Sequence, residues 1–558
     1  MNNNGSGAGR FTNSIAHAPS GAVRYESASP AKTDLPRPGR LDVKPSGPVM
    51  REQVFILRSI TLVGLVILFI WPATLNRGPF FYLDTRSYIR SADAALNKIA
   101  HTRTDWTAED ANSAEGQNLY DVGQAKTRSL KEMTKKGILL GRSLYWGLLP
   151  YIGAITGNFW LTILLQSAAI LVAIYLTLRT LGYPVWPTLV FVSVGLALVS
   201  DAPFYASLLL PDLFVGFVVL GSVVLIAVQR PMGRKEIGAW YLFLSWSLLC
   251  HDAGILTAAL LLGVAAIVNL SRRSWSNWRG LCIILLALIT ASAGQSLVAF
   301  GISRSTHQAP LRIPFLEARL IADGPGTQYL RATCPQSHFT LCEYVKDLPM
   351  PSEEFLWGTD PGKSIYEVAS YERRRDLSAE QLRFVMAVVR YDPAGVLRTG
   401  LLNTWGQFLD FSLSNFDYGA VFDDMMERTF PESALVRIRA SAAYRDKLPV
   451  ALFSVLVYVL VIGSFIYLLL ACLTILPGRN VNGLLKRVFV WAFAGLVLSA
   501  AVGGGISFAQ QRYQARVVWI IPLVALLVES RRWIHRHGDS AVLHDAREKS
   551  ADEEKVQA

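Results

Sequence analysis

The residues with the clearest chemical potential come directly after the first long apolar run. Asp84 and Tyr88 lie four positions apart, just beyond an apolar stretch at 54–75. A stretch of that length can cross the roughly 30 Å hydrocarbon core of a membrane. A carboxylate at the membrane surface can accept the proton of an attacking hydroxyl, so we identify Asp84 as a candidate general base. An ion pair with Arg86 or Arg90 at a helix end is the alternative.

Other ionisable residues stand where apolar runs begin or end. Side chains of this kind are costly at such depths and are often functional. Each also has a structural alternative, because a carboxylate favours a helix start and polar residues favour turns and loops. The candidates for substrate binding are Tyr88, Arg142, Asp201, Asp212, His251, Asp252, Arg512 and Tyr513, with Arg516 one turn beyond them.

Composition places these residues in a membrane protein. Of the 558 residues, 52% are hydrophobic and only 17% are charged, whereas soluble domains carry about 25% charged residues. The apolar residues gather in blocks without the alternation of barrel strands, so we expect an all-α polytopic membrane protein. Ten spans are predicted, at 54–75, 158–178, 184–200, 212–229, 237–251, 253–270, 280–302, 449–475, 488–506 and 515–529.

The distribution of basic residues orients the chain. The apolar run 237–270 would make about 51 Å of helix, which is too long for one crossing, and basic residues flank both of its ends. The run must therefore turn back, and its polar point is at 250–254. Short connections rich in Lys and Arg belong on the cytoplasmic side, while the connection 201–211 contains neither residue. We predict a multi-pass protein of the cytoplasmic (inner) membrane, with both termini cytoplasmic and the candidate site facing outward.

The chain divides into five predicted regions. The first 50 residues cannot bury enough apolar surface to fold, so we expect a disordered tail. Two large segments, 76–157 and 303–448, are expected to face outward. Within the second, the stretch 378–402, interrupted by Pro393, predicts helices that return toward the membrane. The regions are a cytoplasmic tail 1–50, a transmembrane catalytic module 54–302 with external loop 76–157, an external (periplasmic) domain 303–448, transmembrane helices 449–529 and a cytoplasmic tail 530–558.

Two of the five cysteines predict a disulfide. Cys334 and Cys342 lie in the segment 303–448, which we expect on the oxidising side of the membrane. Two free thiols are the alternative, and no arrangement of Cys or His has the spacing of a zinc site. The net charge of +12 does not predict nucleic-acid binding, because the basic residues cluster in short loops beside apolar runs. No glycine-rich nucleotide motif occurs in a suitable context.

The order of these features resembles the GT-C superfamily of polytopic glycosyltransferases, which includes protein O-mannosyltransferases and aminoarabinose transferases. Asp84 and Tyr88 match the family's acidic residue in the first external loop and the tyrosine that often follows it. His251 stands where many members have a lysine or a histidine. The Gln-Arg-Tyr sequence at 511–513 resembles the family's late Arg-Tyr motif, which is often linked with carrier phosphate.

The resemblance implies a reaction and its partners. Members take a sugar from a polyprenyl-phosphate carrier on the outer face of the membrane, among membrane lipids. The acceptor would be a glycan, a lipid or a protein. In that scheme Asp84 is the general base, and Arg512 neutralises the leaving phosphate with help from His251 or Arg142. Direct displacement at the anomeric carbon would invert its stereochemistry.

The resemblance covers roughly 54–302 and 490–529, and it has one informative departure. Members often have Asp-Glu at the first acidic site, whereas Thr85 follows the aspartate here. A divalent metal would therefore lack one carboxylate, and no cofactor is assigned. Asp201 and Asp212 would hold sugar hydroxyls or orient the late arginine.

Three other functions fit parts of the pattern. A polysaccharide polymerase or ligase would share the topology and the arginines but would not need the early Asp-x-x-x-Tyr. A lipid-linked sugar flippase or transporter predicts charged residues near mid-membrane and internal repeats, and the central spans show neither clearly. A structural assembly subunit is the third alternative.

Overall fold

The computed structural model describes residues 48–100, 104–107, 137–358, 360, 363–474, 483–534 and 536. The chain divides into two units, 1–58 and 59–558. In the first unit the structure describes only residues 48–58, which belong to helix α1 (Pro48–Leu68). The predicted disordered tail 1–50 lies outside the described residues except for the start of this helix, as does most of the predicted C-terminal tail.

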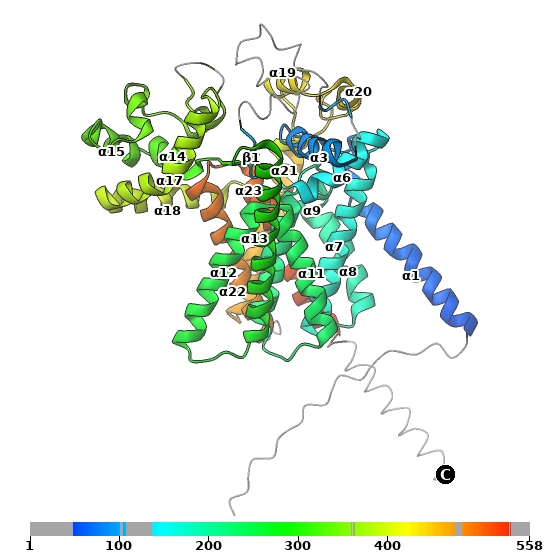
Figure 1. Cartoon of the computed structure of the whole chain (residues 1–558). Helices are drawn as coiled ribbons and strands as arrows, with labels where there is room; N and C mark the ends of the chain where they lie inside the picture. Colours follow the sequence, from blue (N-terminus) through cyan, green and yellow to red (C-terminus); the bar gives the residue numbers. More distant parts are fainter. Residues whose placement is uncertain are drawn as a thin grey trace, which may run out of the picture. The chain divides into compact units, whose positions relative to one another are not determined.

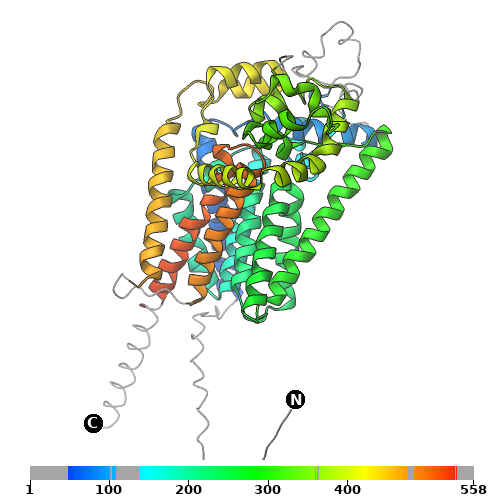
Figure 2. The same ribbon diagram turned by 90° about the vertical axis from the view of Figure 1, so that its left-hand side faces the viewer.

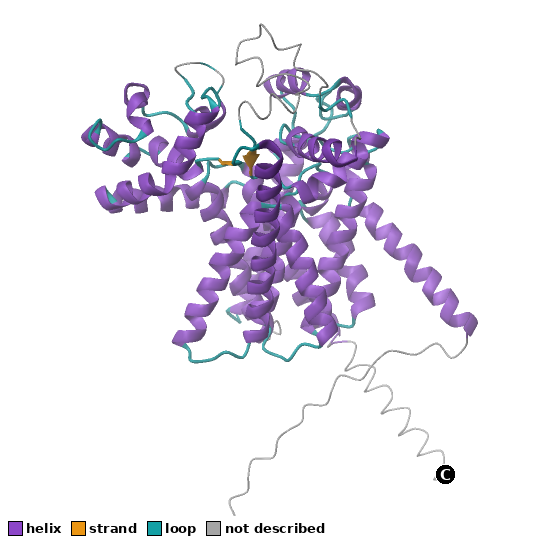
Figure 3. Cartoon of the chain, viewed as in Figure 1, coloured by secondary structure: helices purple, strands orange, loops and turns teal. Residues whose placement is uncertain are grey.

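The second unit is helical almost throughout its described residues (Figures 1 and 3). The strands named within them are two short ones, β1 (Leu139–Leu140) and β2 (Leu311–Arg312), which pair in parallel with Leu139 opposite Leu311. The predicted all-α class is therefore confirmed.

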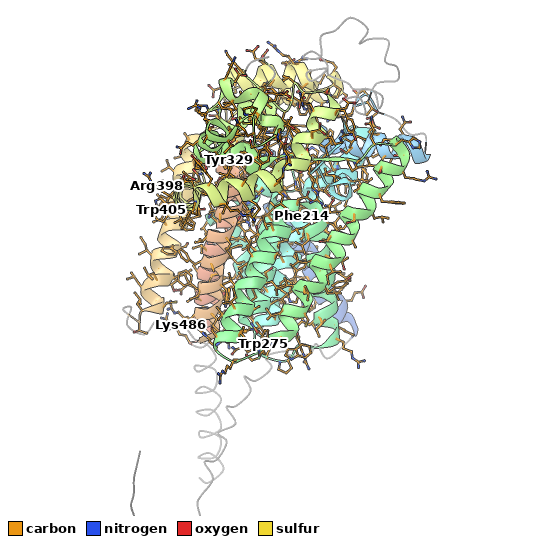
Figure 4. The ribbon with its side chains drawn as sticks, turned by 60° about the vertical axis from the view of Figure 1, so that its left-hand side comes forward. Phe214, Trp275, Tyr329, Arg398, Trp405 and Lys486 are labelled. Carbon is orange, nitrogen blue, oxygen red and sulfur yellow. A yellow bond between two sulfur atoms is a disulfide. The ribbon has the colours of Figure 1, made fainter. Side chains whose placement is uncertain are left out.

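Five helices are long and apolar enough to cross a membrane. Figures 1 and 2 show them running roughly side by side, with α14 to α20 at one end, which we call the upper end. Figure 4 places Trp275 and Lys486 at the opposite, lower end. The five are α7 (Trp160–Leu181), α12 (Asp252–Ser271), α13 (Trp278–Thr306), α21 (Val450–Cys472) and a continuous stretch Gly483–Ile506, made of α22 (Gly483–Ala500) and a π-helical turn, η4 (Ala501–Ile506).

The prediction of ten membrane spans is wrong, because five helices among the described residues have the length and composition of a span. An apolar helix of 16 residues is about 24 Å long, which is shorter than the hydrocarbon core. The first predicted span ends early, because α1 stops at Leu68 and a separate short helix follows. The shorter helices of these regions are α2 (Trp71–Leu75), α6 (Leu144–Thr156), α8 (Val185–Val199), α10 (Asp212–Ala227) and α11 (Arg234–Cys250).

Helix α10 is the centre of the bundle. All of its residues are buried, and it contacts α7, α11, α12, α13, α22 and α23 (Gln511–Val518). A helix that is apolar on every side is expected where protein surrounds it. Its hydropathy therefore reflects burial in protein, which an apolar run does not distinguish from burial in lipid.

A glycine sets the distance between α10 and α23. A Cβ at Gly216 would lie 2.7 Å from the carbonyl oxygen of Arg516, so only glycine allows this approach. Asp212 is one turn earlier in α10 and is thereby brought beside Arg516. Residues 520–534 continue the helical path of α23.

The second large connection, 307–449, has an apolar core of its own at the upper end. Leu320, Leu341, Phe355 and Phe384 are buried in it, and a disulfide joins Cys334 to Cys342. Its elements are α14 (Phe315–Ala322), α15 (Pro325–Thr333), η2 (Thr340–Asp347), α16 (Ser352–Trp357), α17 (Tyr371–Tyr391), α18 (Pro393–Leu409), η3 (Ser414–Phe416), α19 (Ala420–Thr429) and α20 (Glu432–Ala440). As predicted, Pro393 separates two helices, and α18 packs against the π-helical turn η4 of the bundle.

Candidate active site

Asp84 lies in a tightly held loop just before α3 (Thr85–Ala100). The backbone of Phe80 donates to the Ser207 carbonyl and accepts from the Leu209 amide, both at 2.9 Å. The Thr85 hydroxyl accepts from the Tyr82 amide at 3.0 Å and donates to the Leu209 carbonyl at 2.9 Å. The segment around α9 (Ala202–Ala206), which leads directly into α10, therefore fixes Asp84 near Asp212.

Arg142 reaches the same place from the other side. It follows β1, and Gly141 before it has φ of 119°, which favours glycine. The Ser143 hydroxyl accepts from the Trp146 amide at 3.2 Å, capping α6, and donates to the Leu249 carbonyl at 2.6 Å. This bond ties the Arg142 loop to the end of α11, next to His251.

Two arginines hold the Asp84 carboxylate. Oδ1 lies 2.6 Å from Nη2 of Arg142, and Oδ2 lies 2.9 Å from Nη2 of Arg512. Burial alone would raise the pKa of the Asp84 carboxyl, but the two guanidinium charges outweigh it and hold the pKa well below its usual range. Asp84 therefore stays ionised, and the bound arginines weaken it as a base.

Asp212 forms a second, deeper carboxylate site. Its Oδ1 lies 2.8 Å from Nη1 of Arg516, and its Oδ2 lies 3.7 Å from Nη1 of Arg512. The Asp212 side chain is only 3% exposed, compared with 22% for Asp84. Asp84 is thus the carboxylate that a substrate can approach, and Asp212 is placed to orient the arginines.

His251 completes this inner layer at the turn between α11 and α12. Its Nδ1 accepts from the Ala253 amide at 3.2 Å, capping α12. A neutral ring that accepts at Nδ1 carries its proton on Nε2. That nitrogen lies 3.9 Å from Oδ1 of Asp212 and 3.2 Å from Nη1 of Arg516. The distance to the carboxylate is too long for a hydrogen bond, so His251 lies beside Asp212 without donating to it.

Aromatic rings surround the guanidinium groups. The Cζ atom of Arg512 lies 4.5 Å from the ring centre of Tyr82 and 5.2 Å from that of Tyr513, and Arg142 lies 5.8 Å from that of Tyr88. Burial raises the pKa of Tyr82 to about 12, against the opposing charge of Arg512. The Tyr82 hydroxyl therefore remains protonated near neutral pH, and the rings offer the guanidinium groups cation–π contacts.

A glutamine pair supports Arg512 from behind. The Nε atom of Arg512 donates to the side-chain oxygen of Gln510 at 2.8 Å. The backbone of Gln510 is held in turn by the buried side chain of Gln407 in α18, which donates to its carbonyl and accepts from its amide, both at 2.9 Å. The connection 307–449 thus contributes a residue to the support of the site.

Most of the predicted residues meet in one place. We define the arginine–aspartate cluster as Asp84, Arg142, Asp212, His251, Arg512 and Arg516. Ion pairs and hydrogen bonds link the three arginines and two aspartates, His251 lies beside Asp212 and Arg516, and Tyr513 lies against two of the arginines.

Three predicted residues lie differently. Tyr88 is buried against Trp146 and is not open to a substrate. Asp201 is fully buried, and the described residues offer its carboxylate oxygens no hydrogen-bond partner. Asp252 accepts from Gln295 at 2.9 Å and is joined to the cluster by no hydrogen bond or ion pair between described residues.

Sequence reasoning gave no role to Arg516, Tyr82, Gln510 or Gln407. Arg516 shares a helical face with Arg512, because four positions separate them, and this spacing was the available signal. Nothing in the sequence around Gln407 distinguishes it, because the residue that it supports, Gln510, is 103 positions away.

The cluster has three guanidinium groups and two carboxylates, which leaves one surplus positive charge. Such a site suits an anion with several oxygen atoms, and arginine is well matched to phosphate. Across the described parts of the chain, no group of three or more His, Cys, Asp or Glu side chains is placed to hold a metal ion. No protein-family model matches the chain, and no curated protein matches it.

Proposed function

We propose that this protein is a membrane glycosyltransferase that moves a sugar from a polyprenyl-phosphate donor to an acceptor hydroxyl. The observation that carries the proposal is the partly open Asp84 carboxylate held between Arg142 and Arg512. These residues combine a base with cations suited to phosphate. They come from three distant parts of the chain, next to α3, next to β1 and within α23, which Figure 1 shows toward the upper end of the bundle.

The donor itself would activate the base. Its phosphate oxygens compete with Asp84 for Arg142 and Arg512, because both anions suit the same guanidinium geometry. A carboxylate that loses one of these partners becomes more basic. Asp84 would therefore gain basicity only when a donor is bound, which disfavours proton transfer in an empty site.

The reaction follows from this arrangement. The acceptor hydroxyl gives its proton to Asp84 as its oxygen forms a bond to the anomeric carbon of the sugar. The bond from that carbon to the phosphate oxygen breaks, and the electron pair leaves with the lipid phosphate. Arg512 and Arg142 stabilise the charge that develops there. Attack opposite the leaving group inverts the anomeric configuration.

The inner carboxylate has a different role. Asp212 lies deeper than Asp84 and is bound by Arg516, so it does not compete as a base. Its contact with Arg512 fixes the direction of that guanidinium before a donor arrives. Preorganised charge of this kind lowers the barrier because little rearrangement is needed during the reaction.

We further propose that the upper end of the bundle faces outward from the cytoplasmic membrane. Basic residues flank the apolar helices at the other end, where Arg230 donates to carbonyls near the end of α7 and Arg487 donates to the carbonyl of the last residue of α10. Basic connections favour the cytoplasmic side. A carrier lipid with its headgroup in the outer leaflet would then reach Asp84 directly.

The deciding experiment is a transfer assay in proteoliposomes with a panel of polyprenyl-phosphate sugars. Wild type should transfer at least one sugar, and Asp84→Asn should lower the rate by several orders of magnitude at equal protein levels. The matched control is Asp424→Asn, which removes an exposed carboxylate paired with Arg428 on α19. Transfer by Asp84→Asn at the wild-type rate would reject Asp84 as the base.

A further inference from the structure

Helix α18 has an apolar face that no described part of the chain covers. Five large apolar side chains on it are between 48% and 64% exposed. Apart from the adjacent pair Leu401 and Leu402, they recur every three or four positions and therefore lie on one side of the helix. They are Leu397, Leu401, Leu402, Trp405 and Leu409.

Two polar side chains of α18, those of Asn403 and Gln407, point the other way. Asn403 donates to the Asp323 carboxylate at 2.7 Å, and Gln407 holds Gln510. Below them the helix meets the π-helical turn η4, where a Cβ at Gly504 would lie 2.5 Å from the Asn403 carbonyl. The side-chain amides of α18 therefore face the protein, and its leucines face away from the protein.

This pattern is the reverse of a helix on a water-soluble surface, where the apolar stripe faces the core. Contiguous exposed apolar surface marks a contact with a membrane or another protein. The apolar face continues onto the second half of α17, where Leu382, Met386 and Val389 are exposed at helical spacing. The first half of α17 instead exposes charged residues such as Glu372 and Arg375.

The position of α18 identifies what covers it. Figures 1 and 2 show α18 running across the bundle near its upper end, and Figure 4 places Trp405 and Arg398 there, far from Trp275 and Lys486. Tryptophan and arginine are typical of the boundary between acyl chains and headgroups, where an indole is half buried and an arginine reaches phosphates.

The apolar face of α18 is also continuous with a membrane-length helix. The ring of Trp405 stacks with Phe408, which meets Phe493 of α22 with ring centres 5.7 Å apart. Phe493 in turn contacts Phe465 of α21 at 5.6 Å. An unbroken line of aromatic side chains therefore leads from α18 onto helices long enough to cross the bilayer.

We propose that α18 and the second half of α17 lie in the headgroup layer of the bilayer, with their apolar face on the acyl chains of one leaflet. The occupant of this face is membrane lipid, whose phosphates the exposed side chains of Arg390 and Arg398 would hold. This contact between α18 and the membrane does not depend on whether the protein transfers sugars. Its consequence is that lipid supports the helix that supplies Gln407 to the site.

The test uses full-length protein in nanodiscs that hold one copy each. Cys250, Cys282 and Cys472 are replaced by serine, and the Cys334–Cys342 disulfide is kept. A nitroxide label is then placed at Leu401→Cys. The references are Val459→Cys, which is 61% exposed on α21, and Glu353→Cys, an exposed position on α16. Collision rates with oxygen and with a water-soluble nickel chelate report lipid and water, respectively.

We expect the oxygen-to-nickel ratio at Leu401→Cys to exceed that at Glu353→Cys several-fold and to remain below that at Val459→Cys, which lies deeper along a membrane-length helix. A ratio equal to that at Glu353→Cys would mean that water covers the face and would overturn the proposal. Low collision rates with both reagents would mean that protein covers it, which overturns the proposal equally. Because all three labelled positions are exposed, the labels do not disturb the folded core, and the thermal unfolding of the unlabelled cysteine-to-serine protein checks the change at the buried Cys250.

Discussion

Oδ2 of Asp84 lies 2.9 Å from Nη2 of Arg512, although 428 positions separate the two residues. The same arginine also faces Asp212, 3.7 Å away, and donates to Gln510. One guanidinium thus connects the open carboxylate, the buried carboxylate and the backbone support of the site.

Arg512 should affect the use of the donor more than the fold. We expect Arg512→Ala to lower kcat/KM for the lipid-linked donor roughly 10- to 100-fold, because a charge-assisted hydrogen bond contributes about 1.5–3 kcal/mol. Arg512→Lys should recover only part of this loss, since an ammonium group cannot bridge two anions as a guanidinium does. Initial rates at varied donor concentration give the measurement.

The matched control is Arg428→Ala, which removes an exposed arginine paired with Asp424 on α19. Wild-type kcat/KM is expected for it. If Arg512→Ala kept the donor dependence of the wild type, Arg512 would have no part in binding phosphate.

Asp212 should matter for stability as well as for activity. Removing one partner of a buried ion pair costs about 3–5 kcal/mol, because the other charge is left unpaired. Asp212→Asn should therefore lower the midpoint of thermal unfolding in detergent clearly more than Asp84→Asn does. The double variant Asp212→Leu with Arg516→Met should recover part of the loss. Equal midpoints for the two asparagine variants would contradict this division between inner and outer carboxylates.

Gln407 should act as a positioning residue through Gln510. Gln407→Leu removes both hydrogen bonds to the Gln510 backbone and should lower kcat/KM for the donor about tenfold, the equivalent of about 1.4 kcal/mol. The midpoint of thermal unfolding should change much less than in Asp212→Asn. Gln407→Glu keeps the acceptor for the Gln510 amide and should recover part of the rate, which a purely structural role would not predict.

The control on the same helix is Thr399→Val, because among the described residues the Thr399 hydroxyl bonds only to carbonyls of its own helix. Wild-type kinetics are expected for it. A Gln407→Leu variant with unchanged kcat/KM would show that Arg512 does not depend on this support.

Glu317 should make the connection 307–449 less stable at neutral pH. Its side chain is fully buried, neither oxygen has a hydrogen-bond partner among the described residues, and burial and the charge of Glu380 raise its pKa well above the ordinary value. A carboxyl that is neutral when folded but ionised when unfolded destabilises the fold as the pH rises. The loss of folding stability begins near the ordinary glutamate pKa of about 4.3 and continues until the pH reaches the raised pKa of Glu317 in the folded protein.

Glu317→Gln removes that titration. The variant should unfold at a higher temperature than wild type at pH 7.5, and the difference should shrink toward pH 4. The exposed control Glu353→Gln should show neither effect. A Glu317→Gln variant that is less stable than wild type at pH 7.5 would mean that the carboxylate has an ionised role in the folded protein.

The sequence by itself was sufficient for the class of the protein and for most of the candidate residues. Blocks of apolar residues predict helices in any apolar surrounding, and ionisable residues beside them stand out because they are costly there. Asp84, Arg142, Asp212, His251 and Arg512 were all identified on these grounds, and the structure brings them together.

Only the tertiary structure decided what surrounds each helix. A high hydropathy indicates that a side chain is buried away from water, but it does not distinguish burial in lipid from burial in protein. The apolar sequence of α10 therefore predicts a membrane span, although protein surrounds this helix along its whole length. For the same reason, the outward leucines of α18 and the inward-facing Gln407 became visible only in the folded chain. Ion pairs such as Asp84 with Arg512 depend on how distant loops close on each other, which local spacing cannot encode.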